Sequence, residues 1–248
     1  MSCSNAGCRD VYSVPERPEG VSAQGEAIAD ALLTRRSVRG FLPTPVDRET
    51  VEGILYLASR TPSGTNIQPW KAYACTGAVR DALSREILAL HDAGDETHVA
   101  EYAYYPVGWR EPYLSRRRKL GWDYYGVMGL TREDKRGMHR QHGRNFDFFG
   151  APVGLFFTLD RDMERGSWLD AGMFVQSVMI AARAYDLHTC PQAAFMKYHR
   201  VVRRHLAIPE TEILLCGMSL GQLDPDAPEN ALNTERVPVA GFASFHGW

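Results

Sequence analysis

The feature that most constrains the fold is a nearly continuous apolar run at 151–159, with the sequence APVGLFFTL. Such a run is expected for a β-strand that is buried on both faces. Residues 212–220 (EILLCGMSL) predict a second strand, and residues 70–76 (WKAYACT) predict a short third one that ends at Gly77. The chain is therefore expected to build a sheet that other elements cover.

Apolar residues at helical spacing predict helices at five places, namely 23–34, 47–59, 79–91, 167–185 and 198–207. Asp47 is the expected N-cap of the second helix. The fourth helix is apolar on nearly every face, which predicts burial in a core or in a subunit interface. Because strands and helices do not alternate regularly, the pattern favours an α+β fold, with a mixed sheet flanked by helices, over a doubly wound fold.

The length of 248 residues suits one large domain. We expect a flexible polar arm at 1–22 and a single domain at 23–248. Residues 92–149 are rich in Tyr, Trp, Arg and Gly and have poor periodicity, so they are expected to form an excursion from the core. Most of its aromatic side chains are expected to pack it onto the body and a few to line a pocket. Its basic run 116–119 is typical of a solvated helix face, with attraction of anionic substrates as the alternative.

Composition excludes several classes of partner. The net charge of −2 gives no reason to expect nucleic acid or a membrane surface, and no stretch approaches the ~18 apolar residues of a membrane span. The N-terminus lacks the apolar segment of a secretory signal, so a cytoplasmic protein is expected. The histidines show no metal-type spacing. No disulfide framework or metal site is expected from the five cysteines, an odd number without a CxxC pair: Cys3, Cys8, Cys75, Cys190 and Cys216.

Two polar clusters carry the candidate chemistry. Residues 35–41 (RRSVRGF) hold three arginines and a serine, and guanidinium groups match phosphate oxygens through paired hydrogen bonds. Taken alone, this cluster is also typical of a solvated basic helix end. Residues 61–70 (TPSGTNIQPW) form a polar loop whose donors and acceptors suit the edge of a heterocycle or a polyol. Taken alone, that loop is also an ordinary turn before a strand.

Together, RRSxRxF followed by PSGxNxQPW resembles the FMN-dependent nitroreductase family, of the oxygen-insensitive NAD(P)H type. Three further segments agree with it: GAPV at 150–153, TCPQAA at 189–194 and NTERVP at 233–238. The resemblance covers roughly residues 25–248. It implies an intertwined homodimer with FMN at the interface, and NADH or NADPH as co-substrate.

The resemblance also implies which residues contact FMN. Arg35 and Ser37, with Arg36 beside them, correspond to the phosphate and ribityl end, Arg236 to a second phosphate ligand, and Arg39 to the pyrimidine edge. The loop that the partner subunit places over the flavin corresponds to Pro62, Ser63, Gly64 and Asn66. The segment that passes the ring near N5 corresponds to Pro191, Gln192, Ala193 and Ala194. Gln141 and Asn145 match more weakly. No side chain is expected to act as a catalytic acid, base or nucleophile.

The implied function is ping-pong hydride transfer from the nicotinamide to flavin N5 and on to a small nitroaromatic. Quinone or enone reductases and other flavin enzymes on the same fold, or a non-enzymatic flavin-binding protein, are alternatives. A remote alternative is a serine hydrolase, because Gly217–Gly221 fits GxSxG around Ser219, with Asp224 or Asp226 and then His246 in order. Two prolines after this motif argue against the helix that a nucleophile elbow requires.

Overall fold

The sheet at the centre of the molecule has four strands in the order β1-β2-β4-β3. These are β1 (Lys71–Thr76), β2 (Val153–Asp160), β3 (His188–Gln192) and β4 (Glu212–Gly221). The computed structural model describes residues 13–248, so the predictions for Cys3 and Cys8 lie outside the described residues. Each neighbouring pair of strands is antiparallel, and the parallel pairing is confined to an isolated bridge between Ser37 and Thr189. The α+β class is confirmed, with an antiparallel sheet in place of the expected mixed one.

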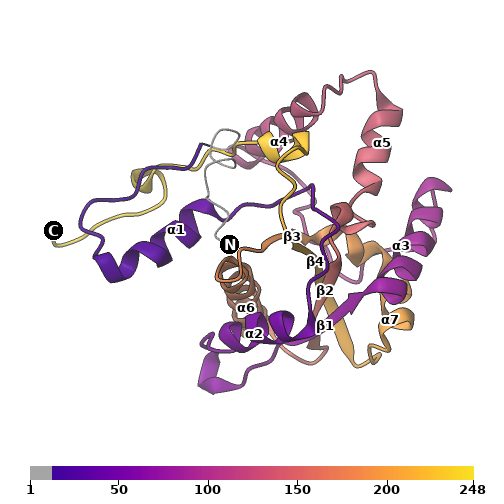
Figure 1. Ribbon diagram of the computed structural model, residues 1–248, viewed down its shortest axis with the longest axis horizontal. Helices are drawn as coiled ribbons and strands as arrows, with labels where there is room; N and C mark the ends of the chain where they lie inside the picture. The colour runs from indigo at the N-terminus through magenta and orange to yellow at the C-terminus, as the bar shows by residue number, and fades with distance from the viewer. Residues whose placement is uncertain (1–12) are drawn as a thin grey trace.

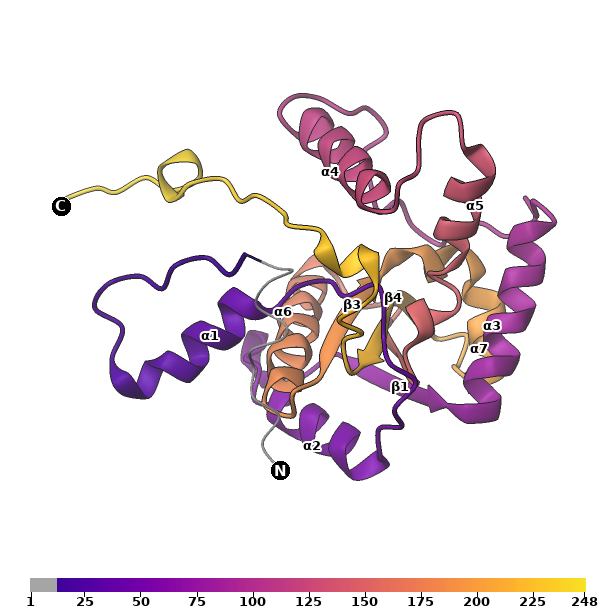
Figure 2. The same cartoon turned by 45° about the horizontal axis from the view of Figure 1, so that its top comes forward.

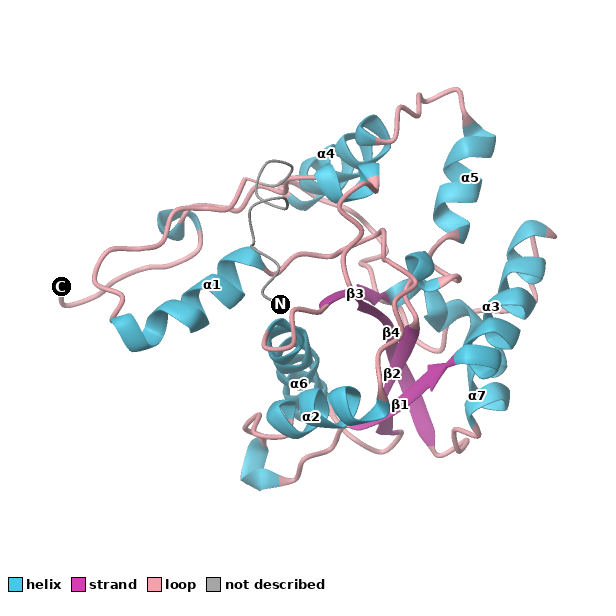
Figure 3. Ribbon diagram, viewed as in Figure 1, coloured by secondary structure: helices cyan, strands magenta, loops and turns pink. Residues whose placement is uncertain are grey.

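Helices cover both faces of this sheet (Figures 1 and 3). One face carries α2 (Arg48–Ala58) and α6 (Arg165–Arg183), and the other carries α3 (Gly77–Asp92) and α7 (His199–Leu206). Strand β2 contributes side chains to the cores on both faces of the sheet, because successive side chains of a strand alternate between faces. Phe156 belongs to the core under α3 and α7, and Phe157 belongs to the core under α6. This alternation explains why the apolar run of β2 is unbroken.

Local signals placed the helix ends well. Asp47 caps α2 as predicted, since its carboxylate accepts a hydrogen bond from the Thr50 amide at 2.6 Å. The helix predicted at 167–185 is α6, and its apolar residues are only partly covered within one chain. Leu169 remains 69% exposed, while Val178 is fully buried against the sheet. The exposed side of α6 is free to meet another surface.

The excursion contains two helices, α4 (Tyr113–Val127) and α5 (Lys135–Gly143). Both project from the same end of the body (Figures 1 and 2). Its first part is anchored by Tyr102, whose hydroxyl donates to the Leu215 carbonyl at 2.7 Å, and by Glu101, which accepts from Arg203 at 3.0 Å. These contacts confirm that part of the excursion is packed onto the body.

The two ends of the described chain both leave the body on one side (Figure 2). Helix α1 (Glu26–Thr34) follows a short turn, Ala23–Gly25, and the tail after β4 contains the short turns Pro228–Ala231 and Val239–Gly241. The remaining short helical turns are Gly64–Asn66, Phe148–Gly150 and Ala193–Tyr198. Within residues 13–248, none of the helices combines the length and the apolar character that a membrane crossing requires.

Candidate functional site

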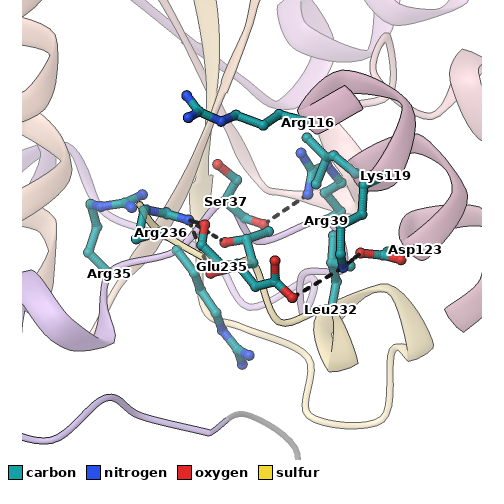
Figure 4. Close-up of a pocket in the computed structure, with 12 residues that line it drawn as sticks. Arg35, Ser37, Arg39, Arg116, Lys119, Asp123, Leu232, Glu235 and Arg236 are labelled. Atoms are coloured by element: carbon teal, nitrogen blue, oxygen red, sulfur yellow. Dashed lines mark hydrogen bonds and ion pairs between the residues drawn. The ribbon is translucent and has the colours of Figure 1, made fainter. Parts of the chain in front are cut away.

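A cationic cleft of about 320 Å³ lies between the segment after α1, helix α4 and the C-terminal tail. It contains Arg35, Arg36, Ser37, Arg39 and Arg236, so the structure brings the predicted phosphate ligands together. Figure 4 shows Arg35 and Arg236 on one side and Arg39 and Lys119 on the other, with Ser37 between them. The other lining residues come from α4 and the tail, namely Arg116, Lys119, Leu120, Asp123, Leu232, Thr234 and Glu235.

The charge of the cationic cleft is strongly unbalanced. Six of its lining side chains are cationic and two, Asp123 and Glu235, are anionic. Lys119 forms ion pairs with Asp123 at 2.6 Å and with Glu235 at 3.4 Å, so both carboxylates of the cleft have a cationic partner. Five arginines remain, and their planar donor groups suit a phosphate dianion. The basic run 116–119 therefore contributes two of its side chains, Arg116 and Lys119, to this cleft, in place of the expected purely solvated face.

The segment that carries the arginines is held in extended form beside the sheet. Helix α1 ends at Thr34, and the Val38 amide donates to the Thr189 carbonyl of β3 at 3.1 Å. Gly40 is needed for close approach, because a Cβ there would lie 2.2 Å from the Cβ of Ala227. On an extended segment Arg35, Ser37 and Arg39 share one side and Arg36 points to the other, so Arg36 needs a second support.

That support is Asn230 in the tail, a residue that the sequence did not reveal. Its side-chain oxygen accepts from the Arg39 amide at 3.0 Å, and its side-chain nitrogen donates to the Gly40 carbonyl at 2.8 Å. Its own carbonyl accepts from Arg36 at 2.8 Å. Asn230 is 4% exposed, so these bonds are made away from water. A single asparagine in a proline-rich tail has no periodicity and no motif by which it could have been found.

An aromatic cleft of about 700 Å³ lies where β3 runs into the excursion. The predicted ring-contacting segment, Pro191, Gln192, Ala193 and Ala194, lines it together with Asn145. Four tyrosines, a phenylalanine and two histidines surround these residues: Tyr102, Tyr104, Tyr105, Tyr198, Phe146, His91 and His142. Tyr104 and Tyr105 are more than half exposed, so a few aromatics of the excursion are open to a ligand as expected.

Lys197 supplies the positive charge of the aromatic cleft. Its ammonium group donates to the Asp95 carbonyl at 2.5 Å and lies 5.2 Å from the centre of the Tyr198 ring. Among the described residues it has no carboxylate within ion-pair distance. This charge is therefore available to an anionic group of a ligand.

Gln192 and Ser219 form a buried pair below the aromatic cleft. The Gln192 side-chain nitrogen donates to the Asn145 carbonyl at 2.6 Å, and its oxygen accepts from the Ser219 hydroxyl at 2.7 Å. Ser219 lies within β4, paired with Gly154 on one side and Cys190 on the other. A hydrolase reading of the GxSxG motif is wrong, because the serine is fully buried in a strand and no turn presents it.

Tyr124 of α4 contacts Arg39 of the cationic cleft. Its ring faces Arg39, with 4.9 Å between the guanidinium carbon and the ring centre. Its hydroxyl accepts from the Gln141 side chain at 2.6 Å, and burial raises the pKa of Tyr124. Gln141 also donates to the buried Glu229 at 3.3 Å, so its amide serves internal contacts and does not line either cleft. Gln141 as a flavin ligand stays a prediction.

The predicted loop over the flavin lies apart from both clefts. Pro62, Gly64 and Asn66 are exposed, and the loop is fixed by the Gly64 amide donating to Asp170 at 3.2 Å. Asn66 has a φ of 60°, a left-handed conformation that asparagine tolerates better than most residues. The loop is thus preformed and open to the outside, together with Ser63. Its part in the site requires a second copy of the chain and stays a prediction.

Two further groups under the cationic cleft are held neutral. Burial, with Arg183 and Arg36 nearby, lowers the pKa of His188 to about 3, and its Nε2 lies 2.9 Å from the Arg183 guanidinium. Burial raises the pKa of the Cys190 thiol. Cys190 is thus a buried filler, as the sequence indicated. The charged side chains near His188 and Cys190 are therefore the arginines.

An α+β fold with a cationic cleft beside a cleft of aromatic rings defines a class of protein that binds a planar, phosphate-bearing small molecule. The Nitroreductase family model matches residues 32–222. The chain belongs to the nitroreductase family.

Curated relatives and solved structures agree with this membership. The chain is 38% identical over 220 residues to a 4-nitrobenzoate reductase of Pseudomonas putida, covering 88% of this chain and 96% of the relative. It is 38% identical to the FMN and NADPH-dependent nitroreductase NfnB from Sphigopyxis sp. strain HMH, with a TM-score of 0.85 over 89% of this chain and 99% of that one. It is 28% identical to NfnB from Mycobacterium smegmatis solved in complex with NADPH, with a TM-score of 0.85 over 90% of this chain and 99% of that one.

Proposed function

We propose that this chain is an FMN-dependent, NAD(P)H-consuming reductase of small nitroaromatics. The observation that carries the proposal is the Ser37–Thr189 bridge, because it sets the arginine segment alongside β3. One molecule with a phosphate at one end and a flat ring at the other can then reach both the arginines and the segment from Pro191 to Ala194. FMN has this form, and its phosphate matches the donor set of the cationic cleft.

The residues present fit the cofactor. Arg35, Arg36, Ser37 and Arg236 would hold the phosphate and ribityl end, and Arg39 would lie toward the ring. When bound, FMN supplies the hydride chemistry that no side chain here can perform. The protein orients the ring through the backbone after β3 and places a fixed positive charge, Arg39, near one edge. No catalytic acid or base is assigned.

The acceptor is proposed to occupy the aromatic cleft. Planar nitroaromatics suit the offset and edge contacts that Tyr104 and Tyr105 offer. Relatives named for 4-nitrobenzoate fit the unpaired charge of Lys197, so a carboxylated nitroaromatic is the favoured acceptor. NADPH is the favoured donor, since it is named for the two NfnB structures.

A homodimer is part of the same proposal. The loop with Ser63 and Asn66 is exposed and preformed, and the exposed Leu169 of α6 lies on an uncovered apolar side. A second copy would cover both and would bring the loop to the partner's flavin. The cytoplasmic location stays a prediction.

The test is a stepwise reduction of the purified protein. The visible spectrum is recorded first, NADPH is then added without oxygen, and 4-nitrobenzoate is added last. Loss of the flavin band with NADPH and its return with 4-nitrobenzoate are expected. A band that returns only with a quinone or an enone would favour the alternative reductases. Absence of flavin after incubation with FMN would overturn the proposal.

A further inference from the structure

A second cluster of chemically capable side chains lies where α5 meets the C-terminal end of α3. It consists of His91 and Asp92 from α3 and His139 from α5. Each offers one ligand atom, and these atoms lie within 4.8 Å of one another. The histidines are 48 residues apart, so no metal-type spacing exists in the sequence, and the fold alone brings them together.

The separations in this cluster match those of ligands that share one ion. His139 Nε2 lies 3.1 Å from Asp92 Oδ1. Zinc bonds of about 2.0–2.2 Å in a tetrahedral arrangement place two ligand atoms roughly 3.3 Å apart. An ion therefore fits between the imidazole and the carboxylate with little movement of either side chain.

The second imidazole makes a backbone contact of a kind that is common for metal ligands. His91 Nε2 lies 3.2 Å from the His139 carbonyl oxygen, and a hydrogen bond from Nε2–H to this carbonyl leaves Nδ1 with its lone pair. Donation of one ring nitrogen to a backbone carbonyl is the common outer contact of metal-bound histidine. The His91 and His139 rings are stacked at 4.1 Å with an angle of 5° between their planes, so one ring must turn about its side-chain bonds before both imidazoles can bind one ion.

We propose that His91, Asp92 and His139 bind one divalent transition-metal ion of the Zn²⁺ type, with water at the remaining position. Two imidazoles and a carboxylate are donors that suit Zn²⁺, Co²⁺ and Ni²⁺ and that do not suit Mg²⁺. The ion would join α3, whose Leu83 and Ile87 are fully buried, to α5 of the excursion. Since His91 also lines the aromatic cleft, the ion would fasten α5 as part of that cleft's wall.

The primary test is a titration of the FMN-incubated protein, freed of affinity tag and stripped with a chelator, with Zn²⁺ in a calorimeter. One ion per chain is expected, and His139→Asn and Asp92→Asn should each weaken binding at least tenfold. The matched control is His98→Asn, which removes an imidazole 2.7 Å from the Asp95 carboxylate. That pair has no second imidazole grouped with it in residues 13–248. Equal binding by wild type and His139→Asn, or no binding at all, would overturn the proposal.

A second readout separates the ion's role from catalysis. Amide hydrogen exchange in α5 should slow when Zn²⁺ is added to the wild type and should stay unchanged in His139→Asn. Circular dichroism of the variants without metal verifies that they are folded. Exchange in α5 that is insensitive to Zn²⁺ in the wild type would contradict the joining of α3 and α5, whether or not the protein reduces nitroaromatics.

Discussion

The two clefts use different physics for recognition. The cationic cleft relies on five arginines drawn from three separate parts of the chain, and a tail asparagine bonds to two of them, Arg36 and Arg39. The aromatic cleft is more than twice as large and relies on exposed tyrosine rings and on Lys197, which has no carboxylate partner within residues 13–248. Attraction between charges acts over a distance, so removing one charge weakens binding markedly. Contacts between aromatic rings are individually weak and adapt to different ligands. The difference indicates that the first cleft fixes a resident group and the second admits changing molecules.

The largest expected effect is on the cationic cleft. Replacing Arg39 with alanine removes a charged donor and its contact with Tyr124. Hydrogen bonds to charged groups contribute about 1.5–3 kcal/mol, so the Kd for FMN should rise roughly tenfold to a hundredfold. Quenching of FMN fluorescence measures this Kd. The control is Arg200→Ala, an exposed arginine on α7. Equal losses in the two variants would show that general charge, and not the cleft, governs binding.

Asn230→Ala tests how the cationic cleft is supported. The variant leaves the Arg39 amide without its partner and removes the Asn230 donor from the carbonyls of Gly40 and Asp224, although the Gly40 carbonyl still accepts from the Asp224 amide at 3.0 Å. Unpaired buried groups cost about 1–3 kcal/mol, so the free energy of unfolding in urea should fall by this order. Weaker FMN binding should accompany it. A variant with normal stability and normal FMN affinity would mean that the arginine segment keeps its conformation without Asn230.

Lys197→Met tests the charge of the aromatic cleft while keeping a long, unbranched side chain that is one atom shorter. The KM for 4-nitrobenzoate should rise about fivefold, in keeping with roughly 1 kcal/mol for a partly exposed ion contact. The KM for nitrobenzene, which has no charge, should stay unchanged, as should the Kd for FMN. Steady-state kinetics with 4-nitrobenzoate and with nitrobenzene measures the two KM values. A parallel rise for the two acceptors would assign Lys197 to packing.

The smallest expected effect is the pH dependence that comes from His188. Its pKa in the folded protein is about 3, below the ordinary 6.5, so the unfolded chain binds more protons between these values. Stability from this residue is therefore complete above pH 6.5 and declines as the pH falls toward 3. His188→Asn should reduce the loss of unfolding free energy between pH 7 and pH 5 by on the order of 1 kcal/mol. Urea titrations at both pH values check it, and an unchanged slope would refute it.

Strands β1, β2 and β4 and helices α1, α2, α3, α6 and α7 could be predicted because each has a local signal. The apolar run at β2 and the Asp47 cap are examples, since burial and capping act over a few residues. Strand β3, which is short and contains Pro191, and the excursion helices α4 and α5 could not. The strand order and the antiparallel pairing could not be predicted, because they depend on how distant segments meet. Family resemblance supplied Arg35, Arg36, Arg39 and Arg236. The structure adds that they lie in one place and that Arg116 joins them.

The residues that sequence reasoning missed act through distant contacts. Asn230 is recognisable only once the tail lies beside the arginine segment. Tyr124 was one aromatic residue among many in the excursion, and its contact with Arg39 follows from the packing of α4. His91 and His139 meet only because α5 lies against α3. Each of these depends on tertiary structure that no local pattern encodes.

The bond between Asn230 and the arginine segment also has a consequence for the order of events during synthesis. The partners Arg36, Arg39 and Gly40 are made 190 or more residues before Asn230. At ~5–20 residues per second, roughly 10–40 s pass between them. All four strands of the sheet are synthesised within that interval, whereas Arg36 and Arg39 still lack their contacts with Asn230. The strands of the sheet are thus synthesised before the residue that supports the cationic cleft. A chain released before residue 230 would contain the core but would lack the Asn230 contacts of that cleft.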